Sequence, residues 1–514
     1  MLRLLVLGAD DRLIQPAKRS GVDDAAVPAL ATPQARRVTG AFIGQPINEA
    51  LLTDIKDRLL DYYVSIGRPF VSVNIPAQDA AAGALRVNVF EIKRGTLRVE
   101  GNRWFDAQQY LGAIRTSAGD PIDTRSLAED ANWINRDDSR HATIAVEPGD
   151  DPSTYNLVVR ARDSLPLNLT VAADNTGTRE TGLYRIGLGV EWTNAFWRGD
   201  DFSYGLLTSP DQFRLIEHAL TYTAYLPWRD SITVSAVNAV ASGRPTEPGD
   251  GSSVNGHDDI ISFRYNLLLP SSFGFGQQID LGYDFKSTNN NVLTGGNTVF
   301  PTTSELDQFV LAYSLRRNDP AGVTGVTALL VGSPGHLTTR NTDFALGEQQ
   351  ADASSSYVYS RLTVERLTNL PLETSWSVRL TAQYSSANLL PSEQLVFGGI
   401  RSIRGFVELG ATRDQGVLMQ NDFRLEPVKF DWPGFRSDAA TLVPFVFLDL
   451  GAGRNHLDPA DAQRSWIEMV STGPGITLQL APYAALRLSW GFPLIRNGHT
   501  GPFLGPQFGT QITF

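Results

Sequence analysis

The chain has 514 residues, no Cys and a formal net charge of −11, and its length suggests about two to four domains. The lack of cysteine excludes disulfide frameworks, thiolate metal sites and cysteine nucleophiles. The acidic balance argues against a nucleic-acid partner, because no basic stripe is present to neutralise phosphates. No run of about 18 apolar residues predicts a transmembrane helix, but a membrane barrel strand needs only about 10 alternating residues and leaves no such signal.

The N-terminal sequence lacks the pattern of an export signal. "MLRLLVLGADD" has one basic residue and a short apolar run, but acidic residues follow at once and no small-residue cleavage site appears. If the protein is exported, we therefore expect its leader to lie upstream of Met1.

Residues 1–163 predict two copies of one α+β arrangement, 1–94 and 95–163, each with a strand, a helical part and two further strands. Helices grouped on one face of a small sheet are a common layer arrangement. The apolar stripe of the first long helix is expected to pack on its own sheet rather than to bind a partner. The predicted elements are strand 2–8, helix 47–67, strands 70–76 and 83–92, then strand 95–101, helices 106–114 and 123–136, and strands 142–149 and 155–162.

After Asp163 helical periodicity disappears, and alternating strands fill residues 164–514. In "LYRIGLGVEW" (183–192), for example, apolar residues share one face while Arg, Gly and Glu take the other. About sixteen such segments occur, within the range of bacterial outer-membrane barrels. This region therefore predicts an all-β, about sixteen-stranded antiparallel transmembrane barrel.

A soluble β-sandwich or propeller is the alternative, because its strands also alternate. Three features favour the membrane barrel: strands often of about 10 to 14 residues against about 5–6 in soluble sheets, polar faces suited to a wet lumen, and aromatic residues at strand ends. The last strand, "PQFGTQITF", places Phe508, Ile512 and Phe514 on its apolar face. It resembles the C-terminal signal by which outer-membrane barrels are recognised for insertion.

An arginine stands in a glycine-rich loop between two alternating segments, in "LVFGGIRSIRGF" (395–406). The surrounding loop, 389–414, follows about the eleventh strand and is too long for a simple turn. It raises the question of what Arg404 pairs with.

A later strand, "VPFVFLDLGAG" (443–453), offers a partner. Alternation turns Val446 and Leu448 to lipid, and so Phe447, Asp449 and Gly451 to the lumen. Because a guanidinium can bind a carboxylate through two parallel hydrogen bonds, we predict that Arg404 folds inward onto Asp449.

The neighbouring residues fit this pairing. Gly405 would supply a backbone conformation closed to other residues, and Phe406 and Phe447 would pack around the pair. The plainer interpretation is that Arg404 is a solvated loop residue and that Asp449 is one more charge of the lumen wall.

The motifs "SIRGF" (402–406, with Ile403) and "FLDLG" (447–451, on the thirteenth strand) resemble the paired motifs of the superfamily of barrel insertases and secretion pores. In that superfamily the loop returns into the barrel and its arginine contacts the aspartate-bearing strand. The two N-terminal repeats resemble POTRA domains. Two such domains before about sixteen strands resemble the TpsB branch, the outer-membrane transporters of two-partner secretion (haemolysin activator type).

The resemblance implies a porin-like protein channel in the bacterial outer membrane, with its POTRA domains in the periplasm. Its implied partners are a secreted TpsA-type exoprotein (an adhesin, haemolysin or toxin), outer-membrane lipid and lipopolysaccharide, and the barrel assembly machinery during biogenesis. The resemblance implies that the exoprotein binds unfolded, as an added strand at a POTRA sheet edge such as 95–101 or 142–162.

Two other functions stay open. An insertase that folds other barrels would share the motifs but usually carries more POTRA domains. A diffusion channel or receptor would not need the repeats. We expect no enzyme, cofactor or metal site, because the sequence contains no nucleophile elbow, P-loop or complete dinucleotide fingerprint, and its six histidines show no ligand spacing. TpsB proteins usually also carry a plug helix before the first POTRA domain, and Met1 lies almost on the first predicted strand.

Overall fold

The computed structural model describes residues 1–514 except 10–19, 244–251, 273–274, 295–296, 301–302, 432–439, 458–465, 482, 498–500 and 504. The chain forms two compact units. Met1–Pro166 and the short segment Trp197–Gly199 make up the first, and Leu167–Phe196 with Asp200–Phe514 make up the second.

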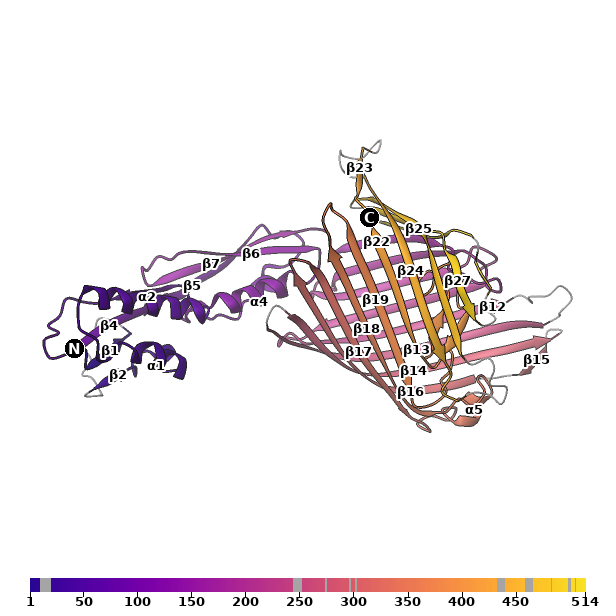
Figure 1. Cartoon of the computed structure of the whole chain (residues 1–514), viewed down its shortest axis with the longest axis horizontal. Helices are drawn as coiled ribbons and strands as arrows, with labels where there is room; N and C mark the ends of the chain where they lie inside the picture. The colour runs from indigo at the N-terminus through magenta and orange to yellow at the C-terminus, as the bar shows by residue number, and fades with distance from the viewer. Residues whose placement is uncertain are drawn as a thin grey trace. The chain divides into compact units, whose positions relative to one another are not determined.

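The first unit begins with a four-stranded sheet in the order β2-β1-β4-β3 (Figure 1). Strand β1 pairs in parallel with β2 and β4, and β3 is antiparallel to β4. Leu51, Ile55 and Leu59 of α2 are buried in one core with Leu5 and Val87 of the sheet. The elements are β1 Leu4–Gly8, β2 Gly21–Asp23, η1 Pro28–Leu30, α1 Pro33–Gly40, α2 Glu49–Ser65, β3 Val71–Asn74 and β4 Ala84–Glu91.

Helix α2 lies where the apolar spacing predicts it. It begins after Asn48, whose side chain accepts a hydrogen bond from the backbone N of Leu51 at 2.8 Å. Helix α1 was not predicted from the sequence, since it buries only Ala35 and Thr39 and shows too short an apolar stripe to recognise.

The second sheet of this unit has the order β5-β7-β6. Strand β7 is central, parallel to β5 and antiparallel to β6. The helices α3 and α4 contribute Tyr110, Leu127 and Ile134 to a separate core. The elements are β5 Lys93–Glu100, α3 Ala107–Leu111, α4 Thr124–Ile134, β6 Arg140–Pro148 and β7 Thr154–Asp163.

One carboxylate ties the end of β7 to the segment before α3. Asp163 accepts hydrogen bonds from the backbone N–H groups of Arg103 (2.9 Å), Trp104 (3.2 Å) and Phe105 (3.2 Å) and from the hydroxyl of Tyr110 (3.0 Å). Burial raises the pKa of Tyr110, so its hydroxyl keeps its proton and donates. This carboxylate thus fixes the turn that leads from β5 into the helices.

We expect Asp163→Ala to destabilise this second sheet, because it leaves three backbone donors and one hydroxyl without their acceptor. The free energy of the local opening that exposes the β7 amides to solvent should fall by about 2–4 kcal/mol. Hydrogen exchange on the full chain measures it. Asp150→Ala, at an exposed position of the same unit, is the matched control. Equal exchange in the two variants would contradict this role for Asp163.

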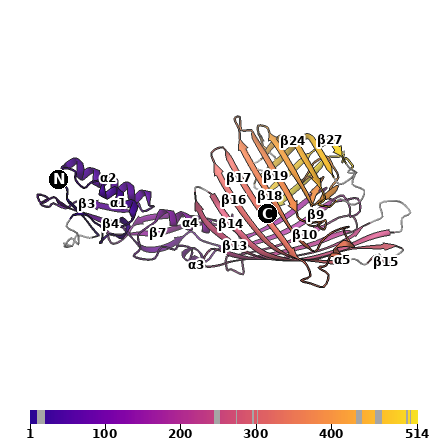
Figure 2. The same ribbon diagram turned by 60° about the horizontal axis from the view of Figure 1, so that its bottom comes forward.

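The second unit is a closed antiparallel barrel (Figure 2). Its strands are β8 Leu167–Asp174, β9 Arg185–Ala195, β10 Asp200–Thr208, β11 Leu215–Tyr225, β12 Ser231–Gly243, β13 Ser252–Ser272, β14 Phe275–Thr294, β15 Asn297–Phe300, β16 Thr303–Asp319, β17 Gly322–Pro334, β18 Ser356–Asn369, β19 Ser375–Ser385, β22 Gln415–Arg424, β23 Val428–Phe430, β24 Ala440–Arg454, β25 Ile467–Leu480, β26 Ala484–Ser489, β27 Phe492–Asn497 and β28 Gln507–Thr513. The small elements β20 Leu395–Phe397, β21 Ala411–Arg413 and α5 Asp343–Gly347 lie in its loops.

The prediction of about sixteen strands is confirmed for the part of the barrel that the structure describes. The short strands β15, β23 and β27 prolong β16, β22 and β26, as their pairings with β14, β24 and β25 show, so the nineteen named strands form sixteen around the barrel. In this count β19 is the eleventh strand and β24 the thirteenth.

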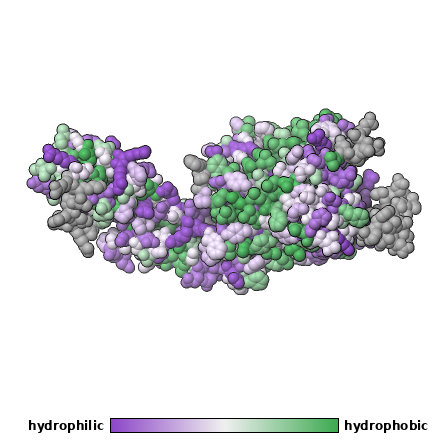
Figure 3. Space-filling view, turned by 90° about the horizontal axis from the view of Figure 1, so that it is seen from below, coloured by the Kyte–Doolittle hydropathy of each residue, from purple (hydrophilic) through white to green (hydrophobic). Residues whose placement is uncertain are grey.

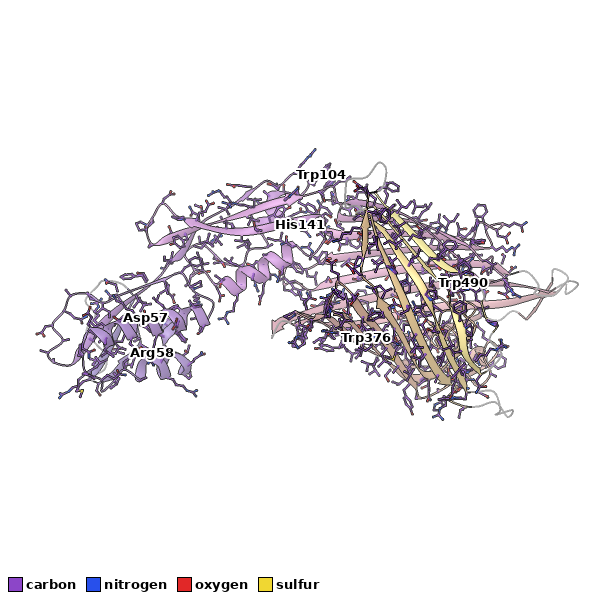
Figure 4. The ribbon with its side chains drawn as sticks, turned by 45° about the horizontal axis from the view of Figure 1, so that its top comes forward. Asp57, Arg58, Trp104, His141, Trp376 and Trp490 are labelled. Carbon is purple, nitrogen blue, oxygen red and sulfur yellow. The ribbon has the colours of Figure 1, made fainter. Side chains whose placement is uncertain are left out.

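The outer face of the barrel is apolar. Alternate residues such as Ile186 and Leu188 of β9 are exposed on the outside, and apolar side chains gather over the barrel strands in Figure 3. Trp376 and Trp490, each about half exposed, also lie on the barrel (Figure 4). Such a surface suits lipid contact, because a closed barrel satisfies its own backbone hydrogen bonds. Among the described residues, no helix has the length and apolarity needed to cross a membrane.

The C-terminal strand closes the barrel by pairing with both β26 and β8. Phe508, Ile512 and Phe514 alternate along it; the ring of Phe508 contacts that of Tyr184, and Phe514 is exposed. Phe514 also exchanges two backbone hydrogen bonds with Leu169 of β8. That these three residues form an insertion signal remains a prediction. Their strand, β28, joins the last part of the barrel to the first.

Candidate functional site: the loop inside the barrel

The loop of residues 389–414, here called the inner loop, connects β19 to β22 and is buried although it is a loop. Ile403 and Phe406 are fully buried, and Arg404 is only 2 % exposed. Its strands β20 and β21 form a small antiparallel hairpin. A loop on the outer surface would be solvated, so this burial means that the inner loop packs against the barrel's inner wall.

Arg404 makes three hydrogen bonds to Asp449 of β24. Its Nε and Nη2 atoms donate to the two carboxylate oxygens at 2.7 Å and 2.6 Å, and its backbone N donates at 3.0 Å. Asp449 is fully buried. The two side chains singled out from the sequence are thus brought together in the bidentate geometry that a lysine cannot reproduce.

Two further charged residues complete this site, and neither was assigned a role from the sequence. The Nη1 atom of Arg404 donates to Asp422 Oδ1 of β22 at 2.7 Å, and Arg487 of β26 donates to Asp422 Oδ2 at 2.6 Å. Two guanidiniums and two carboxylates therefore alternate in a charge cluster, Arg487–Asp422–Arg404–Asp449. Its formal charge is zero, which offsets part of the cost of burying Arg404 and Asp449.

Aromatic rings cover the two guanidiniums. The guanidinium carbon of Arg404 lies 3.8 Å from the ring centroid of Phe447, and that of Arg487 lies 4.3 Å from the ring centroid of Phe445. Cation–π contacts of this kind strengthen when water is excluded. Phe447 thus lies over Arg404, whereas Phe406, which was also expected beside the pair, packs in an apolar cluster with Leu395, Phe397 and Ile403.

Glycines let the inner loop approach the wall. Gly405 has φ +83°, and its backbone lies against Gly491, at the interruption between β26 and β27; a Cβ on Gly491 would lie 2.4 Å from the backbone N of Gly405. A Cβ on Gly451 would lie 2.3 Å from Ile403 Cδ1. The side chain of Gln507 on β28 also accepts a hydrogen bond from Gly405 N at 3.0 Å. The wall is therefore hollowed at the positions that the motif residues occupy.

A second set of contacts holds the base of the inner loop to other strands. The buried carboxylate of Glu393 accepts hydrogen bonds from Lys286 of β14 (2.7 Å) and Tyr359 of β18 (3.0 Å). Asp414 accepts from the backbone of Leu389 (2.8 Å) and of His456 (2.9 Å). The inner loop is thus tied both to β22–β28 and to β14–β18.

Comparisons with known proteins agree with this arrangement. Residues 336–478 match the family model described as haemolysin secretion/activation protein ShlB/FhaC/HecB. The chain is 20 % identical to the heme/hemopexin transporter protein HuxB of Haemophilus influenzae over 499 residues, which cover 94 % of this chain and 84 % of HuxB. It is 22 % identical to the outer membrane transporter CdiB of Escherichia coli over 76 % of this chain and 66 % of that protein.

Solved structures show the same fold. The structure of CdiB from Escherichia coli matches with a TM-score of 0.81 at 16 % identity, covering all of this chain and 90 % of that one. BamA from Haemophilus ducreyi lacking POTRA domains 1–3 matches with a TM-score of 0.54 at 13 % identity, covering 92 % and 95 % of the two chains.

The closed sixteen-stranded barrel preceded by small α+β domains has the same fold as the solved structures of CdiB and BamA, and with the sequence relatives it defines an outer-membrane transporter. Through the matched family model and its relatives HuxB and CdiB, the chain is similar to the TpsB transporters of two-partner secretion. Its barrel lies in the bacterial outer membrane, with the N-terminal domains in the periplasm.

We expect Gly491→Ala to release the inner loop, because the new Cβ would meet backbone atoms of Gly405 that cannot rotate away. Gly205→Ala is the control, since the nearest atom to its Cβ is 3.9 Å away. The chain has no cysteine, so a Ser402→Cys reporter can be labelled selectively. Labelling by a water-soluble maleimide should be at least about tenfold faster with Gly491→Ala than with Gly205→Ala, as expected from a loss of about 1.4 kcal/mol or more of docking free energy. Equal rates would contradict the close approach.

We also expect Arg404→Ala to increase the fraction of time that the pore conducts ions in planar lipid bilayers, by at least about tenfold. Removing one partner of a buried ion pair costs about 3–5 kcal/mol, and here that loss falls on the docked loop. Arg404→Lys should behave more like Arg404→Ala than like the unmodified protein, because lysine cannot bind bidentately. Arg317→Ala is the control. An Arg404→Ala pore as closed as this control would show that the contact does not hold the loop.

Proposed function

We propose that this transporter captures an unfolded exoprotein in the periplasm through its POTRA domains and passes it through the barrel to the cell surface. The observation that carries the proposal is the inner loop itself: a segment occupies the lumen side of the wall, where polar and ionic contacts hold it together with an apolar cluster. None of these contacts belongs to the backbone pairing of the barrel strands, so the loop can leave and return without unfolding the barrel.

The capture step rests on free sheet edges in the N-terminal unit. An extended polypeptide can add to an exposed strand through backbone hydrogen bonds, with little sequence demand. In the second sheet the edge strands are β5 and β6. Strand β7, which the sequence analysis included in a possible edge over 142–162, is paired on both sides and cannot accept a strand; that part of the prediction is wrong.

The proposal needs no chemical step, so we infer that the chain is not an enzyme and requires no cofactor or metal. Folding of the exoprotein outside the cell would give transport its direction. The apolar outer face of the barrel supports contact with outer-membrane lipid and lipopolysaccharide, and assembly of so large a barrel would require the barrel assembly machinery.

The test locks the inner loop to the wall with a disulfide between Ile403→Cys and Gly451→Cys, positions that face each other across the docking surface. Oxidised protein should export its exoprotein at least about tenfold less than the same protein after reduction, because the loop can no longer leave the lumen. Each single cysteine variant, treated in the same way, is a control. Unchanged export by the fully oxidised double variant would overturn the proposed path.

The alternative, an insertase that folds other barrels, predicts a different outcome. Depleting the protein would then lower many outer-membrane proteins at once. For a secretion pore, depletion should affect the surface appearance of one exoprotein and leave the other barrels at their usual levels.

A further inference from the structure

A cavity of about 510 Å³ beside the charge cluster is lined by arginines from several strands, a volume typical of ligand sites. Six of them belong to lumen-facing positions or to the inner loop: Arg316, Arg379, Arg401, Arg404, Arg424 and Arg487. The whole chain has a formal charge of −11, so this local excess of cations is not a consequence of overall composition.

Strand register shows that the strand-borne arginines face the lumen. Directly opposed residues on neighbouring strands point to the same side of a sheet. The pairings run from Arg316 to Gly325, then through Glu365, Arg379 and Gln420 to Asp449. Because Asp449 binds the inner loop, this whole row lies on the inner face.

A second row places the other arginines on the same side. Arg424 stands opposite Phe445, whose ring Arg487 covers inside the barrel. Arg401 belongs to the inner loop itself and is exposed. The cavity therefore brings together side chains from β16, β19, β22, β26 and the loop.

The charges of the cavity do not balance. Arg379 donates to Glu365 at 2.6 Å, and Arg404 and Arg487 are neutralised by Asp422 and Asp449. Among the residues that the structure describes, no carboxylate lies within ion-pair distance of Arg316, Arg401 or Arg424. Six guanidiniums thus face three carboxylates at ion-pair distance, and Glu408 of the inner loop also interacts electrostatically with Arg401. Two positive charges therefore remain in a concave wall, which concentrates the field.

The cavity lies at the end of the barrel that a periplasmic polypeptide reaches first. Strands alternate in direction around the barrel, so β16 and β22, the eighth and twelfth, end where β8 begins, and β8 follows directly on the N-terminal unit. Arg316 lies three residues before the end of β16, and Arg424 ends β22. A segment entering from the periplasm would meet these side chains before it meets the inner loop.

We propose that this arginine cavity binds the carboxylates of an extended acidic segment of the exoprotein, rich in Asp and Glu, and holds it below the inner loop. Each free guanidinium can take a carboxylate through two parallel hydrogen bonds. The inference rests on the proposed function, since it requires a polypeptide in the lumen, and it adds a chemical preference to a capture step that otherwise depends on backbone hydrogen bonds alone.

The test measures binding of a fluorescent peptide of alternating Ser and Glu to the full-length protein in detergent. A peptide of alternating Ser and Gln is the neutral control. The combined variant Arg316→Gln, Arg401→Gln and Arg424→Gln should bind the acidic peptide at least about tenfold more weakly, with a flatter dependence on salt. A charge-matched control removes Arg179, Arg317 and Arg340 in the same way; all three are exposed and none lines the cavity.

Three results would overturn the inference: undiminished affinity in the cavity variant, an equal loss in the charge-matched control, or equal binding of the neutral peptide. A variant with lysine at the same three positions should recover most of the salt-dependent binding, which separates lost charge from lost folding. The assay involves no export, so its failure is distinguishable from failure of the disulfide test, which bears only on the translocation path.

Discussion

The structure of the lumen depends on one buried guanidinium held between two carboxylates. Arg404 lies too deep for water to solvate it, and an uncompensated charge at that depth would be expelled. Asp449 and Asp422 come from different strands, so the docked position of the loop depends on both carboxylates. Only a barrel in which β22, β24 and β26 stand in the observed register presents both acids, with Arg487, to one point.

Glycines of the barrel wall add a steric requirement to this electrostatic one, because they leave space for the loop residues. A barrel of sixteen strands has room for water in its lumen, and a loop of ordinary residues could rest there in many ways. The hollows at Gly451 and Gly491 reduce that freedom, because the motif residues reach the wall only there. The charges supply the attraction, and the absent side chains determine the position.

Much of this could be predicted from the sequence, for a physical reason. Alternation along one strand is a local property, and it assigned Asp449 and Phe447 to the lumen without any tertiary information. The segment "LRLSWGF" (486–492) alternates in the same way, with Arg487 and Gly491 opposite its apolar residues, but alternation cannot show that these two residues meet the loop. That contact joins residues more than eighty positions apart and depends on how many strands separate them around the cylinder.

The central place of β7 and the arginine cavity could not be predicted, because both depend on contacts between distant parts of the chain. Strand β7 had the pattern of any strand, and its central place in the sheet follows from pairing with β5 across two helices. The arginine cavity likewise draws on four strands and a loop, and no local pattern in any one of them marks its arginine as a cavity residue. Helix α1 was missed for a local reason, since its short polar sequence buries too few residues to show a period.

The inner loop and the arginine cavity are coupled through charge. With the loop docked, six guanidiniums lie around the cavity, opposed by Glu365, Asp422, Asp449 and the inner-loop Glu408. When the loop leaves, Arg401, Arg404 and Glu408 leave with it, while Glu365, Asp422 and Asp449 stay on the wall, so the positive excess falls from two to one. An acidic segment bound in the cavity therefore stabilises the docked loop, and departure of the loop weakens the hold on that segment, as linkage requires. The same movement that clears the path would thus release the polypeptide into it.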